Sequence, residues 1–527
     1  MSSQSPGAAR MRDLAFFGVF LVYAWAGIDT RLIYHWQGPV FSTLPGFYRD
    51  FLAHPGGAAE YLYALIAQSY AFAGWGALAV AAQAAALAAV TQAYFKSAAG
   101  KALPLVCFVP PLLLLFDLNL YYDRTPLFVA VPAGLGAALG LVYLRRRWRS
   151  EAALLAAAGI AVVFFVPGAA VGQIMRRPRR PVGIAYLALG AAAPLLAERF
   201  LYVPISARTW FADTDVRRLA VLWGLYIIYA LAPVGRGFHP AAAPPGGAPD
   251  RSPAGRKPRP AMLGVARILL LLFPLVALAG TAYGSYRLNA RDRRLAALDY
   301  YSYREDWPAA LETARGLRTG DFNTLVRYEV NLALHETDAL GDDMLRFPQA
   351  PPILPDLHDD QFLPYMLKIT DLCLRLGRVN EAEHYGSEAM VLGRSDPRVY
   401  RLMARVNLVK GQTAAARKFF NVLSHDLVEG HWARGFLSDM ERSDPEIAEY
   451  RRRMLRTDDM IAVWQRGDKP SADTERLLLD QLEQDPSNRM AFEFLMGQYL
   501  LVRDMVSVHA LMPRIKDMDG PAYRAAG

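Results

Sequence analysis

Long apolar stretches without a charged residue fill the first 286 residues of this chain. An apolar stretch of about 17 to 25 residues can cross a bilayer as one helix. Between Glu60 and Lys96 there are 35 uncharged residues, too many for one straight crossing. We therefore expect a bend near Gly74 and Gly76, with the earlier part lying at the interface. The pattern predicts about seven to eight spans, at 14–28, within 61–95, and at 102–122, 125–144, 152–175, 181–197, 219–235 and 268–286.

After residue 286 the apolar positions follow a helical period and charged residues become frequent. Five positions recur 34 residues later: Leu374, Gly377, Ala382, Tyr385 and Ala389 return as Leu408, Gly411, Ala416, Phe419 and Leu423. A 34-residue period with Gly at the turn and a small residue where two helices cross resembles the tetratricopeptide repeat. About three copies are needed to bury a continuous core, and residues 307–317 and 325–334 look like degenerate copies.

These two patterns predict an all-α fold with two domains. Residues 1–286 form a polytopic α-helical membrane domain, and 287–527 form a tetratricopeptide-like helical-repeat domain. Seven prolines and four glycines in residues 236–260 predict an extended linker between two spans.

Charge is divided unequally between the two halves. Residues 1–284 hold 25 Lys and Arg against 11 Asp and Glu, whereas 285–527 hold 33 against 38. Positive charge in the apolar half is typical of cytoplasmic loops of a membrane protein. Because no aromatic residues are interleaved with these basic clusters in a soluble context, we expect no nucleic-acid partner. The lipid bilayer is the expected environment.

The basic clusters also predict an orientation. Cytoplasmic positions are expected for the clusters at 10–12, 96–101, 145–149, 176–180 and 251–259, which places the N-terminus in the cytoplasm and the loop 29–60 outside. Residues 152–175 have basic clusters at both ends, and Pro167-Gly168 in the middle permits a re-entrant hairpin. With that hairpin the C-terminal domain lies outside, which we expect; with a full crossing it lies inside. An A-x-A pattern at residues 24–26 leaves a cleaved signal peptide as the alternative to an uncleaved first span.

The sequence holds no familiar catalytic or metal-binding motif. Two cysteines, Cys107 and Cys373, exclude a disulfide framework and a cysteine-based zinc site. No P-loop, G-x-S-x-G, dinucleotide-binding turn or H-E-x-x-H occurs. We therefore expect no metal site, and the pattern leaves the cofactor open.

Several runs resemble an uncharacterised, domain-of-unknown-function family of bacterial polytopic membrane proteins. These runs are Gly27–His35, His54–Tyr61, Asn331–His335 and Ala491–Met496. The likeness covers most of the chain and implies a multi-pass protein of the bacterial inner membrane, but it implies no activity.

A second resemblance is architectural. Multi-span glycosyltransferases that use polyprenyl-phosphate-linked sugars place an acid just after the first span, and some carry C-terminal tetratricopeptide repeats. Asp29 stands at that position, and His54-Pro55 followed by Glu60-Tyr61 is similar to the end of such a loop. The chain lacks the clean pair of acids typical of these enzymes.

Glycosyl transfer from a lipid phosphate needs a carboxylate toward the acceptor and a cation toward the leaving phosphate. The candidate catalytic acids are Asp29, Asp50 and Glu60. The candidate substrate-binding residues are Arg31, His35, Arg49, His54, Asp117, Asp123 and Arg124. The alternative for Asp29 and Arg31 is an ion pair marking the water interface, and Asp117 fits a headgroup position as well as a polar cavity.

Three functions remain open from the sequence. The first is a cell-envelope transferase acting on a lipid-linked glycan, with the repeat domain binding an acceptor or a protein partner. The second is a non-catalytic membrane-anchored scaffold that binds a protein partner through its repeats. The third is a transporter or flippase, which lacks the support of an inverted hydropathy repeat.

Overall fold

The structure is a computed structural model that describes residues 6–38, 41–52, 57–99, 105–121, 129, 131–137, 139–140, 228, 260–355, 363–393, 396–438, 440, 445–454 and 474–517. In this part of the chain all the regular secondary-structure elements are helices, and one isolated β-bridge pairs Ser42 with Asp426. The all-α prediction is confirmed for this part of the chain. The chain divides into two compact units, Met1–Gln37 with Leu44–Asn289, and Gly38–Thr43 with Ala290–Gly527.

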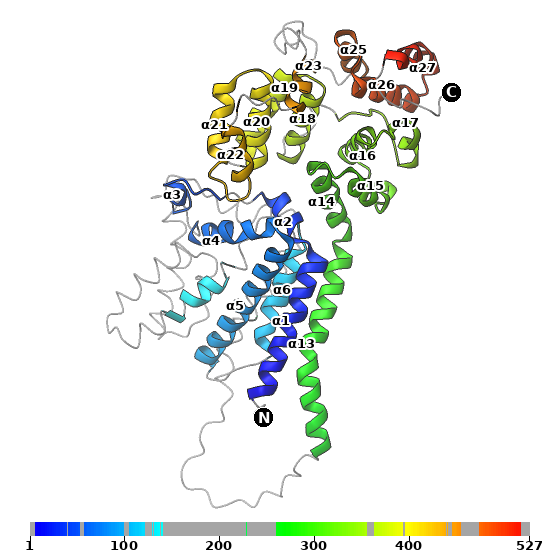
Figure 1. Cartoon of the computed structure of the whole chain (residues 1–527). Helices are drawn as coiled ribbons and strands as arrows, with labels where there is room; N and C mark the ends of the chain where they lie inside the picture. Colours follow the sequence, from blue (N-terminus) through cyan, green and yellow to red (C-terminus); the bar gives the residue numbers. More distant parts are fainter. Residues whose placement is uncertain are drawn as a thin grey trace, which may run out of the picture. The chain divides into compact units, whose positions relative to one another are not determined.

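The first unit is built around four helices that pack side by side: α1, α5, α6 and α13 (Figure 1). Shorter helices connect them, and α4 runs across the direction of α5 (Figure 1). The bounds in chain order are α1 Pro6–Tyr23, the π-helix η1 Ala24–Ile28, α2 Thr30–Gln37, α3 Phe47–Leu52, α4 Gly57–Ala67, the 3-10 helix η2 Gln68–Ala71, α5 Ala73–Ala99, η3 Val106–Phe108, α6 Val109–Leu118 and α13 Pro260–Leu288.

Two stretches in the described residues are long and apolar enough to cross a membrane, Gly7–Ile28 and Ala73–Ser97. Val106–Leu118 is apolar but shorter, and the predicted span 268–286 lies inside α13. The predicted spans 125–144, 152–175, 181–197 and 219–235 and the linker 236–260 lie wholly or largely outside the described residues.

The uncharged stretch after Glu60 bends elsewhere than at the predicted glycines. α4 passes into η2, and Phe72 then takes an extended conformation (φ −120°, ψ 115°) before α5 begins. Gly76 lies within α5, where a Cβ would overlap with the Thr30 hydroxyl. The predicted bend is therefore present but falls at Phe72, two residues before Gly74, and Gly76 serves close helix contact instead.

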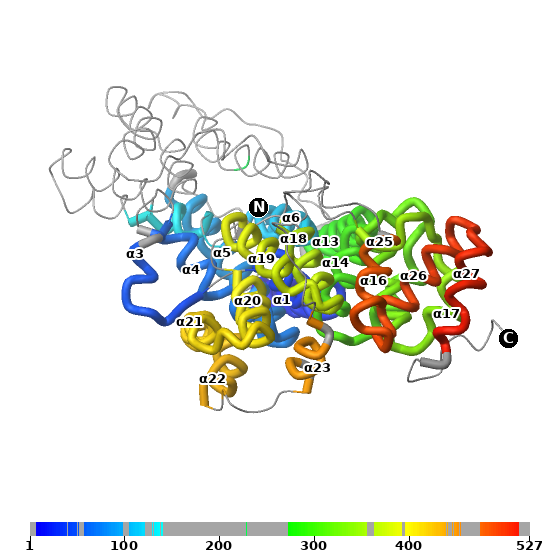
Figure 2. The backbone as a smooth tube through the Cα atoms, turned by 90° about the horizontal axis from the view of Figure 1, so that it is seen from above, coloured from blue at the N-terminus to red at the C-terminus, as the bar shows by residue number. Residues whose placement is uncertain are grey.

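The second unit is a succession of short helices in which neighbours in sequence pack together (Figures 1 and 2). The bounds are α14 Ala290–Tyr303, α15 Trp307–Arg315, η5 Thr319–Asp321, α16 Thr324–Glu336, α17 Leu340–Asp343, η6 Met344–Arg346, α18 Leu363–Arg375, α19 Val379–Gly393, α20 Pro397–Val409, α21 Thr413–Leu423, α22 Gly430–Ser438, α23 Pro445–Arg453, α25 Thr474–Gln484, α26 Arg489–Val502, α27 Met505–Leu511 and η7 Met512–Asp517.

Short polar residues fix where these helices begin. Asn323, Asp396 and Asn488 accept hydrogen bonds from backbone N–H groups in the first turns of α16, α20 and α26 at 2.9, 2.9 and 3.1 Å. Such caps satisfy donors that the helix itself leaves unpaired. Asp306 and Asp504 cap α15 and α27 in the same way. The sequence thus sets the lengths of these helices locally.

The 34-residue recurrence corresponds to two similar helix pairs, α18 with α19 and α20 with α21. Gly377 and Gly411 have positive φ angles of 81° and 74° in the turns between the helices. A positive φ favours glycine, which explains why Gly recurs there. Ala382 and Ala416 are fully buried at the start of the second helices, where a larger side chain would separate the helix pair.

Candidate functional site

Asp29 and Arg31, two of the predicted site residues, lie at the corner that follows α1. α1 ends in the π-turn η1, and Asp29 follows with a left-handed backbone (φ 49°, ψ 85°). Both features are uncommon and occur often at functional positions. The Asp29 carboxylate is held by Arg31 through two contacts of 2.9 Å, Nε to Oδ1 and Nη2 to Oδ2. Asp29 and Arg31 are therefore a bidentate pair at the start of α2, about a third or less exposed.

Thr30 lies at the same corner but points inward. Its side chain is 1% exposed, and its Oγ1 has no hydrogen-bond partner. Gly76 of α5 lies against it so closely that a side chain there would collide. The corner is consequently packed tightly against α5 rather than opened into a cavity around Asp29.

The other predicted residues of the loop 29–60 whose side chains the structure describes lie on three different helices. His35 is buried on α2, Glu60 is half-buried in the first turn of α4, and Arg49 is exposed on α3. α3 is held on α4 by three rings, Phe47, Phe51 and Tyr61, with centroids 5.1 to 6.4 Å apart. The side chain of Asp50 and the residues His54, Asp123 and Arg124 lie outside what the structure describes.

Asp117 lies near the end of α6 and is only 4% exposed. The residue is thus enclosed by protein in the first unit rather than exposed at its surface. One turn later the Tyr121 hydroxyl donates to the carbonyl oxygen of Ile28 at 2.6 Å. That bond satisfies a carbonyl at the end of η1 and ties α6 to the Asp29 corner.

A neutral polar cluster joins three helices of the first unit, and none of its residues is among the predicted site residues. The Tyr23 hydroxyl of α1 donates to the carbonyl oxygen of Ala282 on α13 at 3.0 Å. Asn119, just after α6, donates from Nδ2 to Ser285 Oγ at 3.2 Å and to the Leu115 carbonyl at 2.8 Å. The available signal was an uncharged polar residue within each apolar stretch, since such residues often bind helices together in bilayers.

In the second unit, two of the sequence runs that carry the family resemblance contact each other. His335 of α16 and Glu493 of α26 are both buried, and Nδ1 lies 2.7 Å from Oε2. Arg489 donates from Nε to the other carboxylate oxygen at 2.7 Å and also pairs with Asp338. The runs Asn331–His335 and Ala491–Met496 therefore build one buried contact, although 158 residues separate its two central members.

The chain belongs to the DUF6057 family, a family of unknown function. The family model matches residues 7–525, so it covers both units. The chain matches no curated protein and no solved structure. Membership in DUF6057 thus confirms the resemblance to an uncharacterised family and brings no activity with it.

The second unit of this DUF6057 chain also contains a cluster of three buried charged residues. Lys368 of α18 reaches Asp299 of α14 and Glu329 of α16 with Nζ–O distances of 2.6 and 2.5 Å. Burial raises the pKa of Glu329 to about 8, with Lys368 opposing this shift and Asp299 adding to it. When Glu329 is protonated, the Lys368 ammonium faces only one carboxylate, that of Asp299, and burial favours such a neutral pair.

Residues Gly38–Thr43 belong to the second unit, although the chain on both sides of them belongs to the first. Ser42 forms an antiparallel bridge with Asp426, after α21. Thr43 donates from its backbone N–H and from its hydroxyl to the His425 carbonyl at 3.0 and 3.2 Å. Phe41 is buried. We name residues 38–43 the strap.

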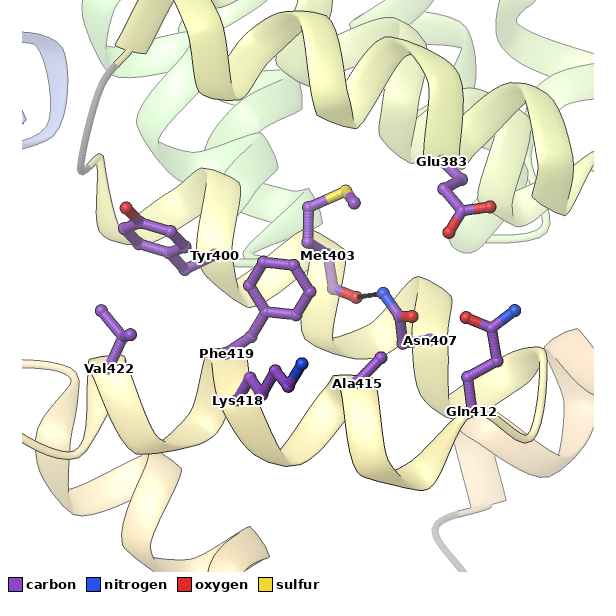
Figure 3. A pocket seen from close by; sticks show the side chains of 9 residues that line it. All are labelled: Glu383, Tyr400, Met403, Asn407, Gln412, Ala415, Lys418, Phe419 and Val422. Carbon is purple, nitrogen blue, oxygen red and sulfur yellow. Dashed lines mark hydrogen bonds between the residues drawn. The ribbon is translucent and has the colours of Figure 1, made fainter.

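The second unit also holds an open groove of about 390 Å³ (Figure 3). α19 and α21 form its walls and α20 its floor (Figure 3). Nine residues line it: Glu383, Tyr400, Met403, Asn407, Gln412, Ala415, Lys418, Phe419 and Val422. None of these was among the predicted site residues, because a groove between helices forms only when distant turns pack. Among the described residues, no group of three or more His, Cys, Asp or Glu could hold a metal ion.

Proposed function

We propose that this DUF6057 protein is a multi-pass protein of the bacterial inner membrane that works as a binding platform. Its tetratricopeptide-like second unit binds a protein partner on the extracytoplasmic side, the side of the loop 29–60. The observation that carries this proposal is the strap, a piece of that loop that belongs to the second unit.

Membrane embedding is supported by the surface of the first unit. On α1 and the π-helix η1 that continues it, Met11, Leu14, Val22 and Trp25 are each at least 60% exposed. Phe16, Phe20 and Ala24 on the opposite side are fully buried. A continuous stripe of large apolar side chains is unfavourable in water and suits contact with lipid.

The strap supports the proposed side of the second unit. Residues 42 and 426 can pair only if both are in one compartment, because a bilayer cannot separate a backbone hydrogen bond. An even number of crossings must then lie between residues 44 and 289. The predicted spans give an even number only if 152–175 is re-entrant, as the basic clusters at both of its ends also suggest.

A platform fits the Asp29 corner better than a transferase does. A general base needs an oxygen free to approach the acceptor, but Arg31 engages both carboxylate oxygens of Asp29. Asp117 is buried, and Arg49 and Glu60 lie on separate helices. The described residues therefore support ligand binding in the second unit more than catalysis in the first.

Single cysteines read with a membrane-impermeant maleimide test the proposed arrangement. Both native cysteines are buried, so added ones dominate the signal. We expect Arg49→Cys and Arg304→Cys to label in intact spheroplasts. Arg10→Cys, at the start of α1, should label only after the membrane is opened. Labelling of Arg304→Cys only after opening would place the second unit in the cytoplasm and overturn the proposal.

A transferase acting on a lipid-linked glycan is the second candidate, and one observation favours it. Asp29 keeps a left-handed backbone beside a π-turn, a strained geometry common at active sites. Asp29→Asn preserves the shape but removes the charge. If this change abolishes the cellular function while the protein level stays normal, and Arg304→Gln does not, the transferase replaces the platform as the better account.

A further inference from the structure

The helix pair that forms the groove differs in charge from the rest of its half. Residues 397–423, which hold α20 and α21, contain six Lys or Arg and no Asp or Glu. The half from 285 to 527 as a whole has more acidic than basic residues. The helix pair itself therefore has an excess of basic residues, which favours negatively charged partners.

Three of these six cations pair with acids that lie outside residues 397–423, whereas Lys418 at the groove does not. Arg398, Arg401 and Lys410 pair with Asp396, Glu429 and Glu383. Lys418 is exposed on α21, and no ion pair involves it among the described residues. Lys410 lies outside the nine lining residues but pairs with Glu383, so Glu383 is compensated without Lys418.

Beside that charge the groove is apolar. The rings of Tyr400 and Phe419 lie 6.2 Å apart, and Met403 faces Phe419 across the floor (Figure 3). At its polar end Asn407 donates from Nδ2 to the Met403 carbonyl at 2.7 Å. This leaves Oδ1 turned toward Ala415 and Gln412 (Figure 3), where it can accept a hydrogen bond from a backbone N–H.

The dimensions suit a short peptide. From Tyr400 to Asn407 the floor is about 10 Å long at 1.5 Å per helical residue. About three residues of extended chain span that distance at 3.3 Å each. The volume of about 390 Å³ is enough for an aromatic or long aliphatic side chain and its neighbour.

We propose that this groove binds an extended, acidic peptide segment of a partner protein. One apolar side chain lies against Phe419 and Met403, and a carboxylate follows it and pairs with Lys418. This inference deepens the proposed platform role and rests on it. A hollow with apolar walls favours a peptide over a membrane surface, since a flat array of headgroups cannot enter it.

Fluorescence polarisation on the full-length protein in detergent tests the proposal. The probes are three fluorescein-labelled octapeptides that share Gly-Ser ends and differ in their cores. The cores are Phe-Leu-Asp-Asp, its neutral twin Phe-Leu-Asn-Asn, and Gly-Gly-Asp-Asp, which lacks the apolar residues. We expect the first to bind about tenfold more tightly than either of the others, because both the charge and the apolar contact contribute.

Lys418→Gln should reduce binding of the acidic core to the level of its neutral twin. The variant is expected to fold because Lys418 is exposed and lies outside the buried core. Arg304→Gln is the matched control, an exposed cation that does not line the groove, and should leave all three affinities unchanged. Equal binding of the acidic and neutral cores, or an unchanged preference in Lys418→Gln, would overturn the proposal.

Anionic vesicles separate the peptide from a lipid surface. Binding of phosphatidylglycerol vesicles that depends on Lys418, together with no binding of the acidic peptide, would show a lipid partner and overturn the peptide assignment. The maleimide experiment above reports on the platform independently of any peptide. A protein that labels as expected but binds no acidic core refutes the groove alone.

Discussion

In the part of the chain that the structure describes, the polar links between helices differ in kind between the two units. In the first, helices are joined by neutral groups: Tyr23, Asn119 and Ser285 form one cluster, and the Gln83 amide donates to the Tyr70 hydroxyl at 3.0 Å. In the second, helices are joined by ions. Arg375 alone contacts Glu305, Glu336 and Asp371 at 2.8 to 3.2 Å.

This difference fits the proposed environments. An unmade charge pair is far more costly in hydrocarbon than in a domain that water can reach, so amides and hydroxyls are the safer links between spans. Two ion pairs in the described part of the first unit lie toward the two ends of the apolar stretch Gly7–Ile28. Arg12, whose side chain is buried, pairs with Asp13 in the first two turns of α1, and Asp29 pairs with Arg31 just beyond η1.

The largest expected effect comes from breaking the ionic cluster of the second unit. Lys368→Met leaves Asp299 and Glu329 facing each other without their cation. We expect a loss of about 3 to 5 kcal/mol in the unfolding free energy, the usual cost of stranding buried charge. Thermal unfolding in detergent, with hydrogen exchange of α14, α16 and α18, measures it. Unchanged protection of these helices would show that the cluster contributes no stability.

The same cluster predicts a pH dependence. The folded pKa of Glu329 is raised to about 8 from an ordinary value of 4.5, mainly by burial. Folding therefore favours the protonated acid, and its stabilisation is lost as pH rises toward and through 8. The unfolding temperature should fall by several degrees between pH 6 and pH 9, and Glu329→Gln should remove most of that fall. An equal fall in both proteins would assign it to other groups.

A smaller effect is expected from two glycines of α5. Gly76→Ala places a methyl group against Thr30, which should cost about 1 to 3 kcal/mol because the corner must shift. Gly74→Ala meets no atom within 4 Å and should be neutral or slightly stabilising. Unfolding in increasing dodecyl sulfate compares the two. Equal stabilities would contradict the close contact between α2 and α5.

The smallest effect is expected in the neutral cluster. Asn119→Leu removes the bonds to Ser285 and the Leu115 carbonyl, and we expect a loss of about 1 kcal/mol, typical of polar contacts between membrane helices. The same dodecyl sulfate titration measures it. A loss as large as that of Lys368→Met would break the comparison, because it would mean that neutral and ionic links are equally strong in the two units.

The sequence predicted local features well and distant ones poorly. The 34-residue recurrence located Gly377 and Gly411 in turns, since a positive φ depends on one residue and its neighbours. The pairing of Thr43 with His425 joins positions 382 residues apart, and no periodic pattern marks it. Gly76 was misjudged for a related reason: its role depends on Thr30, which is distant in sequence. All the membrane spans remain predictions, and those at 152–175, 181–197 and 219–235 lie almost wholly outside the described residues.

A disulfide trap in the strap tests the central claim most directly. Positions 43 and 425 face each other beside the antiparallel bridge of Ser42 with Asp426. Opposed residues in such a pair have Cα atoms about 4.5 to 5.5 Å apart, within the range that a disulfide spans. The double variant Thr43→Cys/His425→Cys, oxidised with copper phenanthroline in native membranes, should give a faster-migrating band that reduction abolishes. Thr43→Cys/Arg304→Cys should not. No cross-link in the first variant, at normal expression, would contradict the placement of the strap in the second unit and with it the proposed side of the repeats.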